Sequence, residues 1–484
     1  MRNIKGNINK FIDKYNVLSA PLKASMWFLF CSIVQKGFAM ISTPIFTRVM
    51  SAEQYGKVAN FSSWYDLIYP FATMYITGVA YNNVLVKHEE EREKATFSLM
   101  TLTSSITLCF FLVYCVGSAF FNQWFEIETS MMYVMFLELL FIPIVDFWSA
   151  KERYDYRYKK LIAVTLMSTV FSMILGLIGV LISNHKYEAR VTAKALVTVI
   201  IGLFLYYSIY KKAKGQIDIK YWKYALRISV PLIPHYLSIK ILNQVDRVMI
   251  TKMEDASSTG LYSLAYTVAS LMIIVTDAIN RSMCPFVYKG IKNNELKPIR
   301  RMTSAVVLLV LMVTILEMLV APELIYVFAT KEYMDAIWII PPVALSIYFT
   351  FLYVVFSNVE FYFEKTIFAT VVSVVVALFN IVLNYIFIGR FGYYAAGFTT
   401  LVCYILFVFL HYINFRRVIK SHQELKDIYN VKFLFLISIV GIVIMLICLY
   451  LYNYRILRWS FVVAILIMGF IYRKNIIKVI KMNI

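Results

Sequence analysis

The sequence predicts an all-α polytopic membrane protein with about 14 transmembrane helices. Of its 484 residues, 61% are apolar and only 16% are charged, and the mean hydropathy is +0.70. Soluble proteins have roughly 45–50% apolar and about 25% charged residues. Long apolar runs recur along the chain, and lysine and arginine collect in every second gap between them. Because short basic loops stay in the cytoplasm, this alternation also predicts the orientation of each helix.

A helix needs about 20 predominantly apolar residues to cross the hydrocarbon core of a bilayer. The segments that meet or approach this length are 22–49, 58–86, 95–121, 130–149, 161–183, 193–210, 224–250, 259–286, 303–328, 336–360, 366–388, 392–415, 432–452 and 456–472. The last is the weakest, because it is short and carries Arg458 near its start. No small-residue cleavage site follows the first segment, so we expect that segment to act as an uncleaved signal.

The gaps between these segments alternate in charge. The basic gaps are 87–94, 151–160, 211–223, 289–301 and 416–432, together with the tail from Arg473. This pattern predicts that both termini are cytoplasmic. The gap 361–365 fits poorly, because it should be cytoplasmic but holds a single lysine. The net charge of +20 is spread over short gaps, which is typical of contact with anionic membrane lipids and argues against a nucleic-acid partner.

An internal repeat divides the chain. The tripeptide Arg-Val-Met ends the first predicted span at Arg48 and the seventh at Arg247, and Tyr55-Gly56 and Gly260-Leu261-Tyr262 follow the two copies. Because the copies are an even number of spans apart, they share one orientation, and we expect two six-helix lobes related by a pseudo-two-fold axis along the membrane normal. The predicted parts are an N-terminal lobe 1–215, a C-terminal lobe 216–420 and two additional spans with a basic tail in 421–484.

Charged residues inside the predicted spans are candidates for substrate binding, because a charge in the membrane normally faces protein or water. Lys36 and Lys240 lie about midway along the first and seventh spans, where they could form a cationic cavity between the lobes for an anionic headgroup. Each lysine could instead pair with a carboxylate, for which Asp66 is a candidate, or reach the membrane interface. Asp277 and Arg281 share one face of the eighth span and form either a substrate site or a plain ion pair.

Other polar residues suggest gating or energy coupling. Asp246, Arg247 and Arg48 lie near the outer ends of the seventh and first spans, where we expect a structural or gating role. The buried acids Glu138 and Glu317 could exchange a proton or bind a coupling cation.

His235 follows two prolines, Pro231 and Pro234, that should kink the seventh span. The kink could be a static bend or part of a moving element, and the histidine could act as a proton switch.

The sequence contains no pattern typical of an enzyme or a metalloprotein. The six cysteines lie in or at the edge of apolar spans without a CxxC pair, which argues against disulfides and a zinc site. We find no nucleophile–base pair, phosphate loop or cluster with metal-ligand spacing. We therefore expect no enzymatic activity, no metal and no cofactor.

Three segments resemble a known family. The stretch 41–56 (ISTPIFTRVMSAEQYG) resembles the first-span signature of bacterial polysaccharide flippases, which export O-antigen and capsule repeat units. Asp246-Arg247 followed by 260–266 (GLYSLAY) resembles the matching element of the second lobe, and 389–397 (GRFGYYAAG) resembles the loop before the twelfth span.

The resemblance implies membership in the multidrug/oligosaccharidyl-lipid/polysaccharide exporter superfamily and residence in the bacterial cytoplasmic membrane. It implies transport of undecaprenyl-pyrophosphate-linked oligosaccharide to the outer leaflet by alternating access, with polysaccharide polymerase or assembly proteins as partners. Cationic residues on the cavity-facing helices would receive the pyrophosphate, here Lys36, Lys240 and Arg281. The two extra spans depart from the twelve-span pattern of such flippases.

Several rival functions remain open. A multidrug extruder would need an apolar or acidic cavity, which the two mid-span lysines disfavour. A flippase for lipid II-type peptidoglycan precursors would account for the two extra spans. A membrane polysaccharide polymerase would show a large external loop, and an acyltransferase an intramembrane histidine with partners; neither pattern is present in the sequence.

Overall fold

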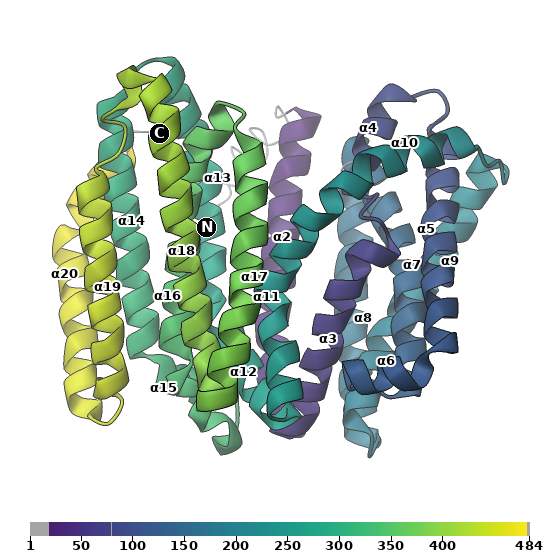
Figure 1. Ribbon diagram of the computed structural model, residues 1–484, viewed down its shortest axis with the longest axis horizontal. Coiled ribbons are helices and arrows are strands. Elements are labelled where there is room, and N and C mark those ends of the chain that lie inside the picture. Colours follow the sequence, from purple (N-terminus) through teal and green to yellow (C-terminus); the bar gives the residue numbers. More distant parts are fainter. Residues whose placement is uncertain (1–18, 79, 482–484) are drawn as a thin grey trace, which may run out of the picture. The chain divides into compact units, whose positions relative to one another are not determined.

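The computed structural model describes residues 19–78 and 80–481, and the regular elements within them are all helical (Figure 1). Over these residues, 11 helices are long and apolar enough to cross a membrane. Each coincides with one of the predicted spans, so the prediction of an all-helical polytopic membrane protein is confirmed. The predicted spans 58–86, 224–250 and 456–472 fall outside this set.

Helix breaks explain two of these three differences. The segment 58–86 divides into α3 (Ala52–Ala72) and α4 (Ala80–Lys87), and the stretch between the two helices contains Met74 and Tyr75 at positive φ. The segment 224–250 divides at Pro231, which has no N–H to donate, into α10 (Ile219–Ser229), the short 3-10 helix η1 (Val230–Leu232) and α11 (Ile233–Met253). The predicted proline kink is therefore present. The segment 456–472 lies within α20 (Arg455–Lys481).

The chain forms two compact units. Unit 1 contains the residues up to Val49 together with Trp64–Ile233, and unit 2 contains Met50–Ser63 and the chain from Pro234. The first turns of α3 therefore belong to unit 2 and the rest of α3 to unit 1. The predicted division into 1–215, 216–420 and 421–484, and the pseudo-two-fold axis, stay predictions.

Unit 1 is built on a group of long helices. Its remaining elements are α2 (Ala20–Val49), α5 (Arg92–Val116), α6 (Ser118–Phe125), α7 (Thr129–Tyr154), α8 (Tyr158–Ile182) and α9 (Lys186–Ala213). α9 packs against α5, α7 and α8, and α2 packs against α8. The core lies where α4, α5 and α7 meet, around Tyr81, whose ring packs edge-on against Phe147 and whose hydroxyl is 2.8 Å from Thr96 Oγ1.

The amphipathic helix α10 lies across the end of α5 and beside α4 (Figure 1). Tyr221 and Ala225 are buried on one of its faces, while Lys220 and Lys223 are exposed on the other. Asp218 caps its N-terminus by accepting a hydrogen bond from the Lys220 amide at 3.0 Å. Because its apolar residues occupy one face only, α10 forms a surface helix and not the start of a span.

Unit 2 is centred on α16. Its other elements are α12 (Ala256–Ala269), α13 (Leu271–Lys292), α14 (Leu296–Leu319), α15 (Ala321–Phe328), η2 (Lys331–Trp338), α16 (Ile340–Tyr362), α17 (Thr366–Phe391), α18 (Tyr394–Ser421), η3 (Gln423–Leu425) and α19 (Val431–Leu451), with α11 and α20. α16 is the most buried of the candidate spans and packs against α12, α13, α14, α18 and α19. Polar side chains on α16 are therefore enclosed by protein.

The helices α19 and α20 are attached to α14. Arg458 on α20 is 3% exposed and forms a bidentate pair with Glu323, with Nη2 2.7 Å from Oε1. Its Nη1 also donates to the Leu319 carbonyl at 2.6 Å, at the end of α14. The arginine that weakened the prediction of the last span is thus accommodated by a partner acid and a helix end.

Candidate functional site

Asp246 is the centre of a buried polar network in unit 2. It lies on α11 with 1% of its surface exposed and accepts three hydrogen bonds. The donors are the Tyr262 hydroxyl on α12 at 2.5 Å, the Thr400 hydroxyl on α18 at 2.7 Å and the Asn384 amide on α17 at 2.5 Å. Because a buried carboxylate is stable only with such partners, the network holds four helices together.

The neighbouring Arg247 faces aromatic rings. Its guanidinium lies 4.5 Å from the Tyr266 ring centre and 5.8 Å from that of Tyr262, and its Nη1 donates to the Asn243 carbonyl at 2.7 Å. Arginine over an aromatic face is favourable even where water is scarce. The gating or structural role of Asp246 and Arg247 stays a prediction. In such a role, these contacts would hold the helices together or would break when the helices move.

The two copies of the sequence repeat contact each other where α3 and α12 begin, within unit 2. A Cβ atom on Gly56 would lie 1.6 Å from the Ala256 carbonyl oxygen, and one on Gly260 would lie 2.1 Å from the Ala52 carbonyl oxygen. The glycines therefore allow two helix backbones to touch directly. Glu332 adds to this contact by accepting a hydrogen bond from the Ala52 amide at 2.8 Å. Arg48, whose Nη1 donates to the Pro44 carbonyl at 3.1 Å, is exposed at the end of α2.

Unit 1 contains two paired acids on α7. Glu138 is 1% exposed and forms an ion pair with Lys194 on α9 at 2.9 Å. The Lys194 ammonium also lies 5.1 Å from the centre of the Tyr65 ring. Asp146, two turns further along α7, accepts a hydrogen bond from the Tyr69 hydroxyl at 2.5 Å. The coupling role predicted for Glu138 would therefore require this ion pair to open.

Glu317 on α14 has different surroundings. It is 8% exposed, and neither carboxyl oxygen has a hydrogen-bond partner among the described residues. An isolated charge is costly in such a place, so Glu317 needs a proton or a cation as its partner. Its coupling role stays a prediction that these surroundings favour.

The five residues predicted to bind substrate lie in both units. Lys36 on α2 and Asp66 on α3 are half-buried in unit 1, and Lys240 is half-buried two turns into α11 in unit 2. Asp277 and Arg281 are exposed on α13, also in unit 2. Each cation thus has part of its surface accessible, as a binding residue requires, and the substrate-binding roles stay predictions.

Two hollows with both polar and apolar walls lie side by side in unit 2, sharing Asn243, Thr350 and Tyr404. The first has a volume of about 110 Å³ and is also lined by Asp277 and Asn280. The second has a volume of about 270 Å³ and is bordered by α11, α16, α17 and α18. Both are large enough for water.

The second hollow brings together histidines that are far apart in the sequence. His235 on α11 and His411 on α18 both line it. His411 also contacts Glu360 on α16, with its Nδ1 3.1 Å from the nearer carboxyl oxygen. The proton-switch role of His235 stays a prediction, and the structure places this residue in the wall of a hollow that has both polar and apolar side chains.

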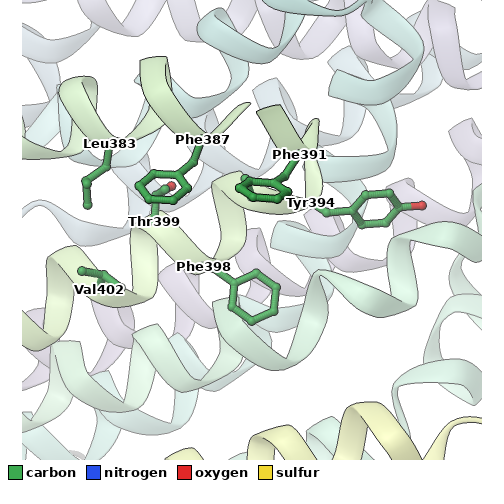
Figure 2. A pocket seen from close by; sticks show the side chains of 8 residues that line it. Leu383, Phe387, Phe391, Tyr394, Phe398, Thr399 and Val402 are labelled. Atoms are coloured by element: carbon green, nitrogen blue, oxygen red, sulfur yellow. The ribbon is translucent and has the colours of Figure 1, made fainter. Parts of the chain in front are cut away.

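A groove between α17 and α18 is larger than either of these hollows and, unlike them, is almost entirely apolar (Figure 2). Its volume is about 470 Å³, and the rings of Phe387, Phe391 and Phe398 line it. Thr399 also lines it, and its hydroxyl already has the Ala396 carbonyl, at 3.0 Å, and the Asn384 side-chain oxygen as hydrogen-bond acceptors. The groove therefore suits hydrocarbon and not a phosphate or a sugar.

The described residues contain no group of three or more His, Cys, Asp or Glu side chains placed to hold a metal ion. The six cysteines are free thiols, two of them exposed. The expectations of no metal and no cofactor stay predictions.

Sequence reasoning missed several polar residues that the structure shows in buried contacts. They include Asp146, Lys194, Glu360 and His411. Asp146 could have been found, because it is an acid within an apolar run. The pairing of Glu360 with His411 leaves no local signal, because 51 positions separate the two residues.

Comparisons with known proteins agree with this architecture. Relatives from Haemophilus influenzae include the "Lsg locus putative protein 1", 21% identical over 290 residues, which are 57% of this chain and 67% of that protein. An "uncharacterized membrane protein" of the same organism is 20% identical over 355 residues, 71% of this chain and 85% of that one. Both identities are low, but both matches are long.

The fold is similar to that of solved transporters. A structure of the lipid II flippase MurJ in an inward closed conformation matches with a TM-score of 0.67 and 16% identity, covering 93% of this chain and 100% of that one. An inward-facing multidrug resistance MATE transporter of the MOP superfamily matches with a TM-score of 0.64 and 12% identity, covering 80% and 96%. The sequence profile of the family described as "polysaccharide biosynthesis protein" matches residues 22–290, more than half of the chain. This multi-pass membrane protein therefore belongs to the polysaccharide biosynthesis protein family and has the fold of MOP-superfamily transporters.

Proposed function

We propose that this protein is a flippase that moves undecaprenyl-pyrophosphate-linked oligosaccharide repeat units from the cytoplasmic to the outer leaflet, for synthesis of a surface polysaccharide such as capsule or O-antigen. The observation that carries the proposal is the match to the lipid II flippase, which spans 93% of this chain and the whole of that one, in a chain of the polysaccharide biosynthesis family. The mechanism is alternating access in the bacterial cytoplasmic membrane, with both termini in the cytoplasm.

The mid-helix cations fit this cargo. A pyrophosphate carries several negative charges, and lysine and arginine are the side chains that bind phosphate oxygens. Lys36, Lys240 and Arg281 would receive it, and Asp66 and Asp277 would hold these cations when the site is free. The polyprenyl chain would stay in the bilayer throughout. Only the polar headgroup would need shielding from the hydrocarbon, because burying polar groups without partners is costly.

Energy coupling and partners complete the proposal. Glu138, Glu317 and His235 would exchange protons or a cation during the cycle. Anionic lipids would contact the basic gaps, and polysaccharide polymerase or assembly proteins would receive the exported unit.

A multidrug extruder is the second candidate, because the fold also matches a MATE transporter. Extrusion of cationic drugs would require an apolar or acidic cavity, which the positive charges proposed for the substrate path at Lys36 and Lys240 disfavour. A lipid II-type precursor would bind through the same pyrophosphate chemistry. The transporter fold gives no support to a polymerase or an acyltransferase.

Paired substitution of the two lysines tests the role of positive charge. In cells depleted of the native protein, Lys36→Ala with Lys240→Ala should abolish surface polysaccharide, because the pyrophosphate loses its counter-charges, while the paired Lys→Arg variant should retain export. Lys297→Ala, at an exposed lysine in the first turn of α14, is the matched control. Membrane abundance is measured alongside. Normal polysaccharide in the double alanine variant would refute the cation site.

A further inference from the structure

The pair Glu360 and His411 is among the most deeply buried titratable groups of unit 2. Glu360 on α16 is 0% exposed and His411 on α18 is 1% exposed. The imidazole Nδ1 lies 3.1 and 3.2 Å from the two carboxyl oxygens. Tyr353 and Phe407 hold the imidazole, with ring centres 5.2 and 4.8 Å away. Charged side chains are rarely buried this deeply unless they are paired, so the pair is a specific feature of the fold.

The second ring nitrogen of His411 faces different surroundings. Nε2 is buried and has no hydrogen-bond partner among the described residues, although buried polar atoms are nearly always paired. His411 is also part of the wall of the hollow of about 270 Å³. Because Nδ1 is adjacent to the carboxylate, the neutral imidazole would place its hydrogen there and leave a free lone pair on Nε2. That lone pair can accept a proton from water in the hollow.

The surrounding helices supply few other titratable groups. His235 on α11 and Tyr404 on α18 line the same hollow, as does Tyr353 on α16, while α17 contributes Ser373. On α13, Tyr288 packs edge-on against Tyr362 near the end of α16, and Asp277 lines the adjacent hollow. The described lining of both hollows includes no lysine or arginine. His411 is the basic side chain in direct contact with Glu360, so a proton on His411 would balance the charge of this carboxylate.

We propose that Glu360 and His411 form a proton-binding site that loads from the hollow and couples transport to a proton gradient. The coupling part rests on the proposed flippase function. Loading adds one proton to Nε2 while the Nδ1 hydrogen stays donated to Glu360, which gives an imidazolium–carboxylate pair. Release returns the proton from Nε2 to water. The pair joins α16 to α18, so its charge state acts directly on the packing of two central helices of unit 2.

Proton binding is measured by NMR on the purified full-length protein with ¹⁵N-labelled histidine. The chain has five histidines, and His411→Gln identifies the signal of interest. We expect the Nε2 signal to move from its unprotonated to its protonated position as the pH is lowered, and the Glu360→Gln substitution to change this response. A His411 signal that stays constant over the whole pH range in which the protein remains folded would overturn the site.

Coupling is measured in proteoliposomes with lipid-linked oligosaccharide extracted from the source cell. An imposed pH gradient should change the translocation rate of the native protein, and Glu360→Gln and His411→Gln should lose this response. Glu360→Asp keeps a carboxylate and should therefore retain the response to the pH gradient. This variant separates loss of proton binding from misfolding. His422→Gln is the matched control, because His422 pairs with Glu424 at 3.3 Å on the surface.

A full gradient response in Glu360→Gln would overturn the coupling. Failure of the native protein to move the lipid contradicts the flippase function instead, and the NMR result then decides the proton site alone.

Discussion

The charged side chains of this protein differ in how they are stabilised. Asp246 is buried and held by three donors on three other helices. Glu91, in contrast, lies on the surface before α5, where it accepts hydrogen bonds from the Lys220 ammonium and the Tyr221 hydroxyl, both at 2.6 Å. The first arrangement fixes helices in the centre of unit 2, and the second fastens α10 to the rest of unit 1.

The attachment of α10 should depend on pH. Hydrogen bonds from Lys220 and Tyr221 lower the pKa of Glu91 from its ordinary 4.5 to about 2. A carboxyl group with a lowered folded-state pKa stabilises the fold above its ordinary pKa and loses that effect as the pH falls through the lowered one. The contact should therefore be constant between about pH 5 and about pH 8 and weaken below about pH 4.

Trp222 can report this change, because its indole N–H donates to the Ser98 carbonyl at 2.6 Å. Its fluorescence should change on acidification, and Glu91→Gln should produce part of that change at neutral pH. Glu90→Gln, at the exposed neighbour, is the control. Identical pH profiles for native protein and Glu91→Gln would show that this carboxylate does not hold α10.

At the scale of elements, close helix contacts replace apolar packing where the two repeat copies meet. Gly56 and Gly260 bring the first turns of α3 and α12 into backbone contact. Sequence comparison predicted that these positions were equivalent but gave no indication that they touch, because the contact requires the complete packing of unit 2. The missing Cβ atoms are thus a structural requirement and not only a repeat signature.

Adding a single methyl group should disrupt this contact. Gly56→Ala would place a Cβ against the Ala256 carbonyl and should destabilise the protein by about 1–3 kcal/mol, the usual effect of overpacking. Gly37→Ala on α2 is the matched control, because nothing lies within 4 Å of its added Cβ. Alanine's better helix propensity should make that variant neutral or more stable by up to about 1 kcal/mol. Thermal unfolding in detergent compares the two; equal midpoints would contradict the close contact.

At the scale of the whole molecule, the sequence predicted the helices well and their interruptions poorly. Apolar length identified 11 spans that the structure confirms, because a helix in lipid must satisfy its own backbone hydrogen bonds. The breaks near Met74 and Pro231 depend on local backbone geometry. Pairs such as Glu138 with Lys194 depend on which helices become neighbours, and nothing in a single sequence specifies that.

The substrate-binding site stays a prediction. Lys36, Lys240 and Arg281 were selected by depth and charge alone, and the structure leaves each of them at least partly accessible. The hollows of unit 2 were not predicted, because their walls come from four or more helices with no shared motif. Depth along a helix is therefore readable from a sequence, whereas the convergence of side chains is not.

Lipid analysis after depletion of the protein in its source cell tests the central claim most directly, with the leaflet of each lipid-linked oligosaccharide determined by its accessibility to an external glycan-modifying reagent. We predict that undecaprenyl-pyrophosphate-linked repeat units accumulate in the inaccessible cytoplasmic leaflet and that re-expression moves them to the accessible one. Unchanged glycolipid amount and leaflet distribution, together with altered drug efflux, would contradict the flippase function and favour an extruder.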